Sequence, residues 1–289
     1  MPLFIKLSIY DRRIFFAKLK EKINSSWEKF YPKYNISRAS FFVYLLGKSN
    51  IPKRLFEKWK TIAQYTPKHI STINQEKYMQ KKIPAITFDN NLAEIFGVLN
   101  GDGYISPLSY EIAIIGNRKE IQYSNYLKKL LEDKLKIKFN LKRAKSIFTL
   151  RGYSIELSKL LTEVYGLPKG NKTGKLHIPI SVKKQKTFLI NYLRGLFDTD
   201  GTFYLRRETD PVIEISSGDK SFLQEIEQTL LSLNFKAGRG EYRVFIYNKQ
   251  DIARFFDEIK PANTKHLNKY RKYLKLSAGG PMAKTIAFH

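Results

Sequence analysis

Two aspartates, Asp102 and Asp200, share an unusual sequence context. Each is followed by a glycine, and these are the only two Asp-Gly pairs in the chain. Each also follows another glycine by five residues, Gly97 in one case and Gly195 in the other. The apolar positions around them match as well, so residues 92–105 and 190–203 form an internal repeat with an offset of 98 residues. One Asp-Gly pair is typical of a turn, whereas two with matched apolar prefixes indicate a duplicated unit.

Each copy predicts an apolar helix that ends at Asp-Gly and leads directly into a strand. Gly97 and Gly195 lie four residues before Gly101 and Thr199, so small residues share one helix face and would let the two helices approach closely. Such an approach would place both carboxylates side by side at the negative ends of helix dipoles. A divalent cation between Asp102 and Asp200 would remove the repulsion.

A site of this kind predicts hydrolysis of phosphodiesters. Mg²⁺ binds carboxylate oxygens together with water and phosphate oxygens, and it activates water for phosphodiester hydrolysis. We therefore expect Asp102 and Asp200 to be both catalytic and metal-binding, with Gly101 and Thr199 as further candidates at the metal site.

The stretches 95–103 and 193–201 resemble the two LAGLIDADG motifs of single-chain, two-repeat homing endonucleases. The first stretch matches at Gly97, Asp102 and Gly103, and it departs at Asn100, where the family often has an acidic residue. The second is the closer match, with agreement at Leu193, Gly195, Leu196, Asp198, Asp200 and Gly201.

This resemblance implies an α+β fold of two αββαββα units related by a pseudo-twofold axis, with the motif helices at their interface and two antiparallel sheets forming a DNA-binding saddle. It also implies a monomer that cuts double-stranded DNA at a long, asymmetric target site with Mg²⁺, for which Mn²⁺ or Ca²⁺ can substitute. Repeat one is expected at 89–182 and repeat two at 183–275.

The rest of the larger part of the chain follows the same order twice. Alternating and helical apolar patterns predict strands at 104–108, 111–116, 139–143 and 147–151 around a helix at 120–135, and then strands at 203–207, 212–217, 235–239 and 243–247 around a helix at 220–233. Basic residues of these strands are candidate DNA contacts, although a solvent-exposed strand face is an equally good explanation for each: Lys142, Arg143, Arg206, Arg207, Arg239 and Arg243.

Members of the family also place a basic residue close to the scissile phosphates near the end of each repeat. Residues 167–179 resemble that segment, and either Lys172 or Lys175 could supply the charge. In the second repeat the matching residue is Lys265. A cation there would stabilise the charge that develops on the phosphate during hydrolysis.

The charge of the chain favours a polyanionic partner. There are 52 Lys and Arg against 26 Asp and Glu, a net charge of +26, and residues 1–88 hold 18 basic and 5 acidic residues. Pro84 and the apolar run that follows it suggest a domain boundary near 80–84. The composition of the end of the chain predicts a flexible tail at 276–289.

Residues 1–85 are predicted to form a small all-α unit that resembles a helix-turn-helix domain. Ser37 is suited to begin a helix and Gly47 to end it. In the helix-turn-helix interpretation this helix would enter the major groove, with Arg38, Ser40 and Tyr44 as candidate contacts. A helical bundle with a solvated basic face is the alternative.

The composition excludes several other classes. The chain has no cysteine and only four histidines, without the short spacing of a metal site, which excludes disulfide scaffolds, thiol catalysis and Cys-ligated zinc and fits an intracellular location. No apolar run approaches the roughly 20 residues of a membrane span, so no membrane is expected. A non-catalytic nucleic-acid binder of the same fold, either an intron RNA maturase or a helix-turn-helix transcription regulator, remains the alternative function.

Overall fold

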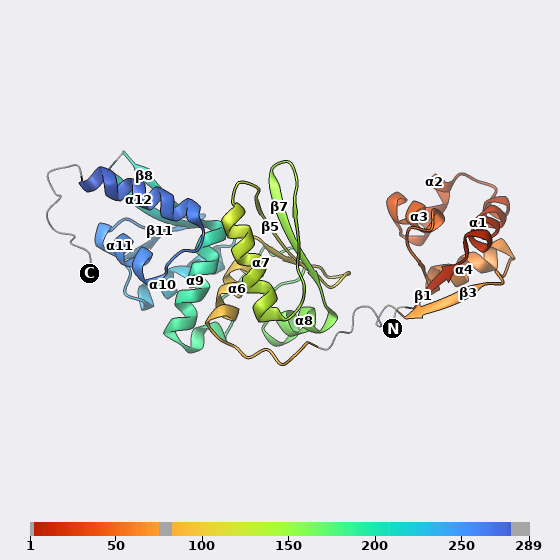
Figure 1. Ribbon diagram of the computed structural model, residues 1–289, viewed down its shortest axis with the longest axis horizontal. Coiled ribbons are helices and arrows are strands. Elements are labelled where there is room, and N and C mark those ends of the chain that lie inside the picture. Colours follow the sequence, from red (N-terminus) through yellow and green to blue (C-terminus); the bar gives the residue numbers. More distant parts are fainter. Residues whose placement is uncertain (1–2, 75–82, 208, 279–289) are drawn as a thin grey trace. The chain divides into compact units, whose positions relative to one another are not determined.

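The computed structural model describes residues 3–74, 83–207 and 209–278, and the chain divides into two compact units, Met1–Gln80 and Lys81–His289 (Figure 1). Most of the predicted boundary at 80–84, and all but the first three residues of the predicted tail at 276–289, lie outside the described residues. Residues 276–278 belong to a helix, so the predicted tail begins too early. Among the described residues, no helix is both long enough and apolar enough to cross a membrane.

The smaller unit contains the predicted helices and also a sheet. Its elements are β1 (Leu3–Leu7), α1 (Ile9–Ile23), α2 (Trp27–Phe30), a 3₁₀ helix (Tyr31–Tyr34), α3 (Arg38–Leu45), β2 (Ile51–Pro52), α4 (Lys53–Ala63) and β3 (Ile70–Asn74). The strands form an antiparallel sheet in the order β2-β1-β3. The prediction of an all-α unit omitted this sheet, because its strands are short and pair across more than 40 residues of chain.

Aromatic side chains fill the core of the smaller unit. Phe15, Phe41, Phe56 and Trp59 are at most 1% exposed, and the Phe15 and Phe56 rings stack with centroids 5.1 Å apart. The buried carboxylate of Asp11 accepts hydrogen bonds from the backbone N–H groups of Lys68 and His69, which ties α1 to the start of β3. The helices and the sheet therefore share one core.

The larger unit shows the predicted αββαββα order twice, which confirms the predicted fold class. The first repeat comprises α6 (Asn90–Asn100), β4 (Gly103–Ile105), β5 (Glu111–Asn117), α7 (Ile121–Leu135), β6 (Asn140–Arg143), β7 (Ile147–Tyr153) and α8 (Ile155–Lys159). The second comprises α9 (Lys186–Asp200), β8 (Gly201–Arg206), β9 (Asp210–Ser216), α10 (Lys220–Ser232), β10 (Ala237–Arg239), β11 (Arg243–Ile246) and α11 (Lys249–Glu258), and α12 (Thr264–Ala278) follows it.

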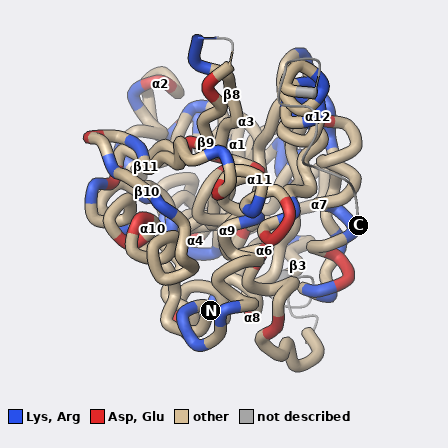
Figure 2. Tube along the Cα trace, turned by 90° about the vertical axis from the view of Figure 1, so that its left-hand side faces the viewer, with Lys and Arg blue, Asp and Glu red and all other residues tan. Residues whose placement is uncertain are grey.

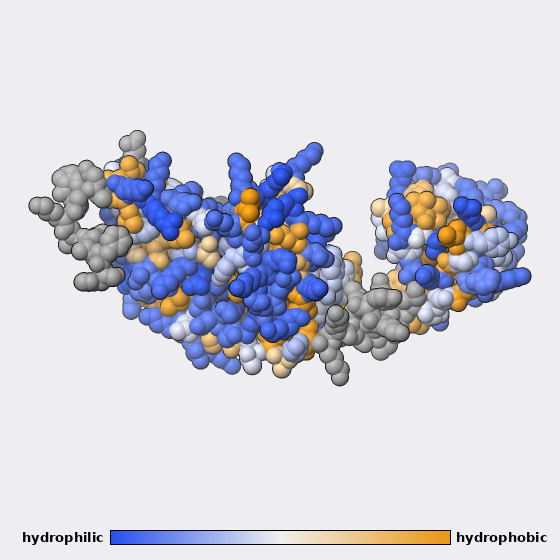
Figure 3. Space-filling model, viewed as in Figure 1, coloured by the Kyte–Doolittle hydropathy of each residue, from blue (hydrophilic) through white to orange (hydrophobic). Residues whose placement is uncertain are grey.

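The two sheets have equivalent strand orders. The first is β4-β5-β7-β6 and the second is β8-β9-β11-β10, and every pair is antiparallel. Apolar side chains of alternate strand residues point to one face, where they join the helices in a single core that spans both repeats. The opposite face of each sheet, called the outer face below, carries polar residues such as Lys142 and Thr149 in the first sheet and Arg206 and Glu214 in the second. Hydrophilic residues cover much of the surface of the larger unit in the view of Figure 3.

Candidate active site

The two motif helices, α6 and α9, lie against each other near the middle of the larger unit (Figure 1). A Cβ added to Gly97 would lie 2.0 Å from the backbone oxygen of Tyr192, and one added to Gly195 would lie 2.1 Å from the backbone oxygen of Glu94. The two helix backbones therefore touch directly at their glycines, reciprocally, as expected for units related by a pseudo-twofold axis. Gly97 and Gly195 lie at the helix interface that the sequence predicted.

The same crossing brings Asp102 and Asp200 to one place. α9 ends at Asp200, and Asp102 follows α6 by two residues. A Cβ on Gly101 would lie 2.0 Å from Thr199 Oγ1 and 3.3 Å from the carboxyl carbon of Asp200, so the two helix ends adjoin. Hence the two aspartates come together at the carboxyl ends of the crossed helices.

Burial disfavours the charged forms of both carboxyls, and a neighbouring carboxylate adds repulsion at each, Glu120 at Asp102 and Asp102 at Asp200. Burial and the neighbouring Asp102 raise the pKa of Asp200 to about 7, although Lys172 and Lys265 oppose the rise. Burial also raises the pKa of Asp102, against the attraction of Lys265. The pair therefore forms a site at which an additional positive charge would be strongly favoured.

Lys172 lies at this site. Its ammonium donates to the backbone oxygens of Leu99 and Asn100 at 3.3 and 2.9 Å, and also to that of Gly101, so it satisfies the carbonyl groups at the end of α6. Burial lowers the pKa of Lys172, while the carboxylates of Asp200 and Asp102 act in the opposite direction.

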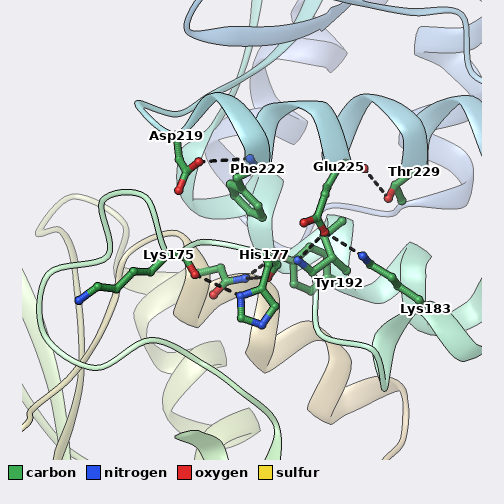
Figure 4. A network of polar contacts seen from close by, with 10 residues as sticks. Lys175, His177, Lys183, Tyr192, Asp219, Phe222, Glu225 and Thr229 are labelled. Carbon is green, nitrogen blue, oxygen red and sulfur yellow. Dashed lines mark hydrogen bonds and ion pairs between the residues drawn. The ribbon is translucent and has the colours of Figure 1, made fainter.

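Lys175, the alternative candidate, has an exposed side chain. Its backbone oxygen contacts the ring of His177, and Figure 4 shows its side chain extending away from His177 and Tyr192. The structure thus separates the two lysines that the sequence left as alternatives, and it brings Lys172 to the aspartates.

Lys265 approaches the pair from the second repeat. Its ammonium lies 3.1 Å from a carboxylate oxygen of Glu120, and both side chains line a pocket of about 540 Å³ together with Asp102 and Asn117. Sequence reasoning did not select Glu120. It directly precedes α7, as Asp219 directly precedes α10, so an acidic residue before the central helix of each repeat was a signal available in the sequence.

The segments that carry Lys172 and Lys265 each contact the opposite repeat. Lys265 of the second repeat contacts Glu120 of the first, and the backbone N–H of Leu176, close to Lys172, donates to Asp219 of the second repeat at 3.2 Å. Each segment therefore reaches the acidic residue that precedes the central helix of the opposite repeat. The site is built from both repeats at once.

The two further metal candidates have other partners. The backbone oxygen of Gly101 accepts from Lys172, and the hydroxyl of Thr199 donates to the backbone oxygens of Gly195 and Leu196 within its own helix. Among the described residues, no group of three or more His, Cys, Asp or Glu side chains is placed to hold a metal ion. The carboxylates of Asp102 and Asp200 stay the candidate ligands for a cation.

The candidate DNA contacts on the strands divide between the two faces of the sheets. Strand alternation places Lys142, Arg206 and Arg243 on the outer faces. Arg143 instead donates to Ser124 and Asn125 of α7, and Arg239 forms an ion pair of 2.8 Å with Glu227 of α10. Arg207 is exposed after the end of β8, with a left-handed φ of 53°.

Aromatic rings accompany the arginines on the outer face of the second sheet, and sequence reasoning did not select them. The guanidinium of Arg206 lies 5.0 Å from the ring centroid of Tyr247, which stacks on Phe245 with centroids 4.5 Å apart. Arg243 forms an ion pair of 3.1 Å with Glu214. These contacts fix both arginines in place.

In the smaller unit, the three candidate contacts of α3 differ in accessibility. Arg38 is exposed, with its guanidinium 5.7 Å from the Phe42 ring. The hydroxyl of Ser40 is bonded to that of Ser37, which caps the helix, and Tyr44 packs against the ring of Trp59. Of the three, only Arg38 has an exposed side chain.

Comparison with known proteins supports the interpretation of the motifs. Residues 187–260, from α9 to just beyond α11, match the family model of a LAGLIDADG-like domain. The resemblance predicted from the two motif stretches is therefore confirmed, with the sequence match lying in the second repeat. No curated protein matches the chain.

Several solved structures are similar to this chain at low identity. The homing endonuclease I-DmoI in complex with DNA and Mn is 16% identical, with a TM-score of 0.43 over 59% of this chain and 96% of that one. Full-length DUF199/WhiA from Thermatoga maritima is also 16% identical, with a TM-score of 0.46 over 71% of this chain and 66% of that one. The N-terminal LAGLIDADG domain of DUF199/WhiA has a TM-score of 0.43 at 16% identity, over 62% of this chain and 86% of that domain.

Proposed function

We propose that this chain, which contains a LAGLIDADG-like domain, is a sequence-specific endonuclease of the homing type that cuts both strands of duplex DNA with a divalent cation. Asp102 would serve one strand and Asp200 the other. One observation carries the proposal: two half-buried carboxylates meet at the ends of two crossed helices, with the ammonium groups of Lys172 and Lys265 beside them.

The donor set fits a hard divalent cation. Carboxylate oxygens are the ligands that Mg²⁺ prefers, and Mn²⁺ and Ca²⁺ accept the same donors. Asp102 and Asp200 would hold the cation, because burial disfavours the charged form of both and Asp102 further disfavours that of Asp200, and a positive charge between them would offset this cost. When bound, such a cation polarises the scissile phosphate and lowers the pKa of a bound water.

The residues of the chain itself supply charge and orientation around the phosphate. Lys265 acts more strongly on Asp102 and Lys172 more strongly on Asp200, and at both places a cationic group stabilises the negative charge that develops on the phosphate oxygens. Glu120 holds the ammonium of Lys265 at 3.1 Å, so this lysine is oriented before DNA binds. Lys172 is oriented by the carbonyl groups at the end of α6.

Charge and the outer faces of the sheets support duplex DNA as the partner. The net charge is +26, and blue Lys and Arg residues are frequent in Figure 2, for example on α12. Lys142 lies on one outer face, and Arg206 and Arg243 lie on the other. Because the two faces carry different side chains, one monomer would read a long target without symmetry, inside the cell.

The proposal predicts a specific failure of two variants. Asp102→Asn and Asp200→Asn should each abolish cleavage of the strand they serve while leaving DNA binding intact, because each removes a cation ligand but no DNA contact. A target is first selected from a library of randomised duplexes by cleavage in Mg²⁺. The cleavage rate and the gel-shift affinity for this target are then measured for each variant. In the same assay Lys172→Met should slow cleavage far more than Lys175→Met. Cleavage at the parental rate by both aspartate variants would refute the proposal.

A second candidate function is regulation or RNA binding without catalysis. The smaller unit favours it, since α3 presents the exposed Arg38 on a compact basic domain that joins the larger unit in one chain. Metal-independent binding to an operator or to intron RNA, with no library duplex cleaved, would support this function over the endonuclease.

A further inference from the structure

Two residues before each of Asp102 and Asp200 lies a buried polar side chain that the proposed reaction does not use. These residues are Asn100, which is 1% exposed, and Asp198, which is 0% exposed. They occupy equivalent positions in the two motif helices. Burying a polar group without partners is costly, so the partners of these two side chains indicate what each of them does.

Asp198 holds the segment that leads to Lys265. One carboxylate oxygen accepts from the backbone N–H of Ala262 at 2.8 Å, and the other accepts from the N–H of Asn263 at 3.0 Å. The side chain of Asn263 donates back to the backbone oxygen of Asp198 at 3.1 Å and accepts from the N–H of Lys265 at 3.2 Å. A continuous set of hydrogen bonds therefore runs from α9 to the start of α12.

Asn100 holds the segment that contains Lys172. Its side-chain amide donates to the backbone oxygen of His177 at 2.9 Å and to the hydroxyl of Tyr192 at 2.7 Å. Figure 4 shows how the same segment also lies on α10, where Glu225 accepts from the N–H of Ile178 at 3.0 Å and from Lys183 at 2.9 Å. This segment is thus held at several points.

The chemical difference between Asn100 and Asp198 matches the backbone groups that they hold. Asp198 faces two N–H donors and needs two acceptor oxygens, whereas Asn100 faces a carbonyl oxygen and a hydroxyl and needs a donor. Exchanging the two residue types would set donor against donor at position 198 and a carboxylate against a carbonyl oxygen at position 100. The amide nitrogen at position 100 therefore suits the carbonyl oxygen of His177, while the Oδ1 of Asn100 has no hydrogen-bond partner among the described residues.

Building on the proposed endonuclease activity, we propose that Asp198 and Asn100 are positioning residues, each of which fixes the lysine of its own repeat at the paired aspartates. Lys265, fixed through Asp198, shares a pocket with Asp102 of the opposite repeat. Asp198 therefore governs cleavage of the strand served by Asp102, and Asn100 governs the strand served by Asp200 through Lys172.

The first test is strand-resolved cleavage of an end-labelled target duplex by Asp198→Asn and Asn100→Asp. Asp198→Asn should slow the cut made at Asp102 by about 100-fold, since small misplacements of a catalytic group have effects of this size, and should change the other cut by less than about threefold. Asn100→Asp should slow the opposite strand. Equal slowing of both strands, or of neither, would overturn the proposal.

Asp251 supplies the matched control. It is also a buried carboxylate of the second repeat, in the first turn of α11. Its side chain accepts from the backbone N–H of Lys236 at 2.9 Å and pairs with Arg254 at 3.5 Å, and both partners lie outside the two lysine-bearing segments. Asp251→Asn should lower stability without favouring either strand. If Asp251→Asn showed the same strand preference as Asp198→Asn, lost stability alone would explain the effect, and the proposal would be overturned.

The second test does not require catalysis. Hydrogen exchange in the full chain should be at least about tenfold faster at one of the amides of Ala262 and Asn263 in Asp198→Asn, because the Asn side chain keeps only one acceptor oxygen, and unchanged at both in Asp251→Asn. Unchanged exchange in Asp198→Asn would overturn the positioning role. A parental protein that cleaves no duplex would instead refute the proposed function, while the exchange result would still show whether Asp198 holds the segment.

Discussion

The two repeats of the larger unit share one topology but differ in their buried polar groups. Both have the same strand order, the same glycine contact and an aspartate at the end of the motif helix. In contrast, Glu94 and Asn100 of the first repeat correspond to Tyr192 and Asp198 of the second. The apolar periodicity of both copies thus maintains the shared fold, while their buried polar residues differ.

The ion pair between Glu94 and Arg194 is the clearest departure from symmetry. Glu94 of α6 is buried, and Arg194 of α9 reaches it at 3.3 Å and also donates to the backbone oxygen of Ile259 at 2.9 Å. The symmetry-equivalent positions hold Tyr192 and Phe96, so the pair occurs once in a twofold arrangement. Removing this ion pair therefore tests whether the two repeats differ in their contribution to stability.

The largest expected effect on stability follows from Arg194→Met. Removing the cation leaves the carboxylate of Glu94 buried, and burial already raises the pKa of that group, so the larger unit should lose about 3–5 kcal/mol in urea unfolding. Lys220→Met, which breaks an exposed pair with Glu241, should change stability by less than about 1 kcal/mol. If Arg194→Met also lost less than about 1 kcal/mol, the ion pair would not make the first repeat energetically different from the second.

A smaller effect, equal in both repeats, is expected at the glycine contact. Gly97→Ala and Gly195→Ala each push a Cβ to within about 2 Å of a backbone oxygen of the opposite helix, and overpacking of this kind costs about 1–3 kcal/mol. The two losses, measured by denaturant unfolding, should agree within about 1 kcal/mol. Gly218→Ala is the control, since a Cβ there would meet no atom within 4 Å. Clearly unequal losses would contradict the twofold contact.

The smallest predicted effect is a pH dependence specific to the second repeat. Burial, together with Lys265 and Lys269, lowers the pKa of His266 from 6.5 to about 3, so the folded chain keeps this ring neutral. The unfolded chain binds the proton below pH 6.5, and the stability that His266 contributes is therefore lost as the pH falls from 6.5 towards 3. Between pH 7.5 and pH 5.5 this loss amounts to about 1 kcal/mol.

The measurement compares urea unfolding of the parent with that of His266→Phe at both pH values. Asp198 and Asp200 act in the opposite direction, because burial raises the pKa of each to about 7 and their protonation favours the folded state. The difference between parent and variant removes this shared contribution. If both proteins lose stability equally between the two pH values, His266 does not titrate as predicted.

The sequence by itself determined the repeat, the order of its elements and the two aspartates, because helices, strands and Asp-Gly turns depend on neighbours only a few residues apart. The predicted strands of the larger unit agree with β4 to β11 to within about two residues at most of their ends. The glycine spacing likewise predicted the close approach of the motif helices.

Only the tertiary structure decided which polar groups meet. It selected Lys172 over Lys175, turned Arg143 and Arg239 towards the helices, added Glu120 beside Lys265 and revealed the sheet of the smaller unit. These outcomes depend on contacts between residues far apart in the chain, such as Asp198 with Asn263 and Asn100 with His177. Local periodicity does not encode such pairings, because they arise only once the two repeats have packed together.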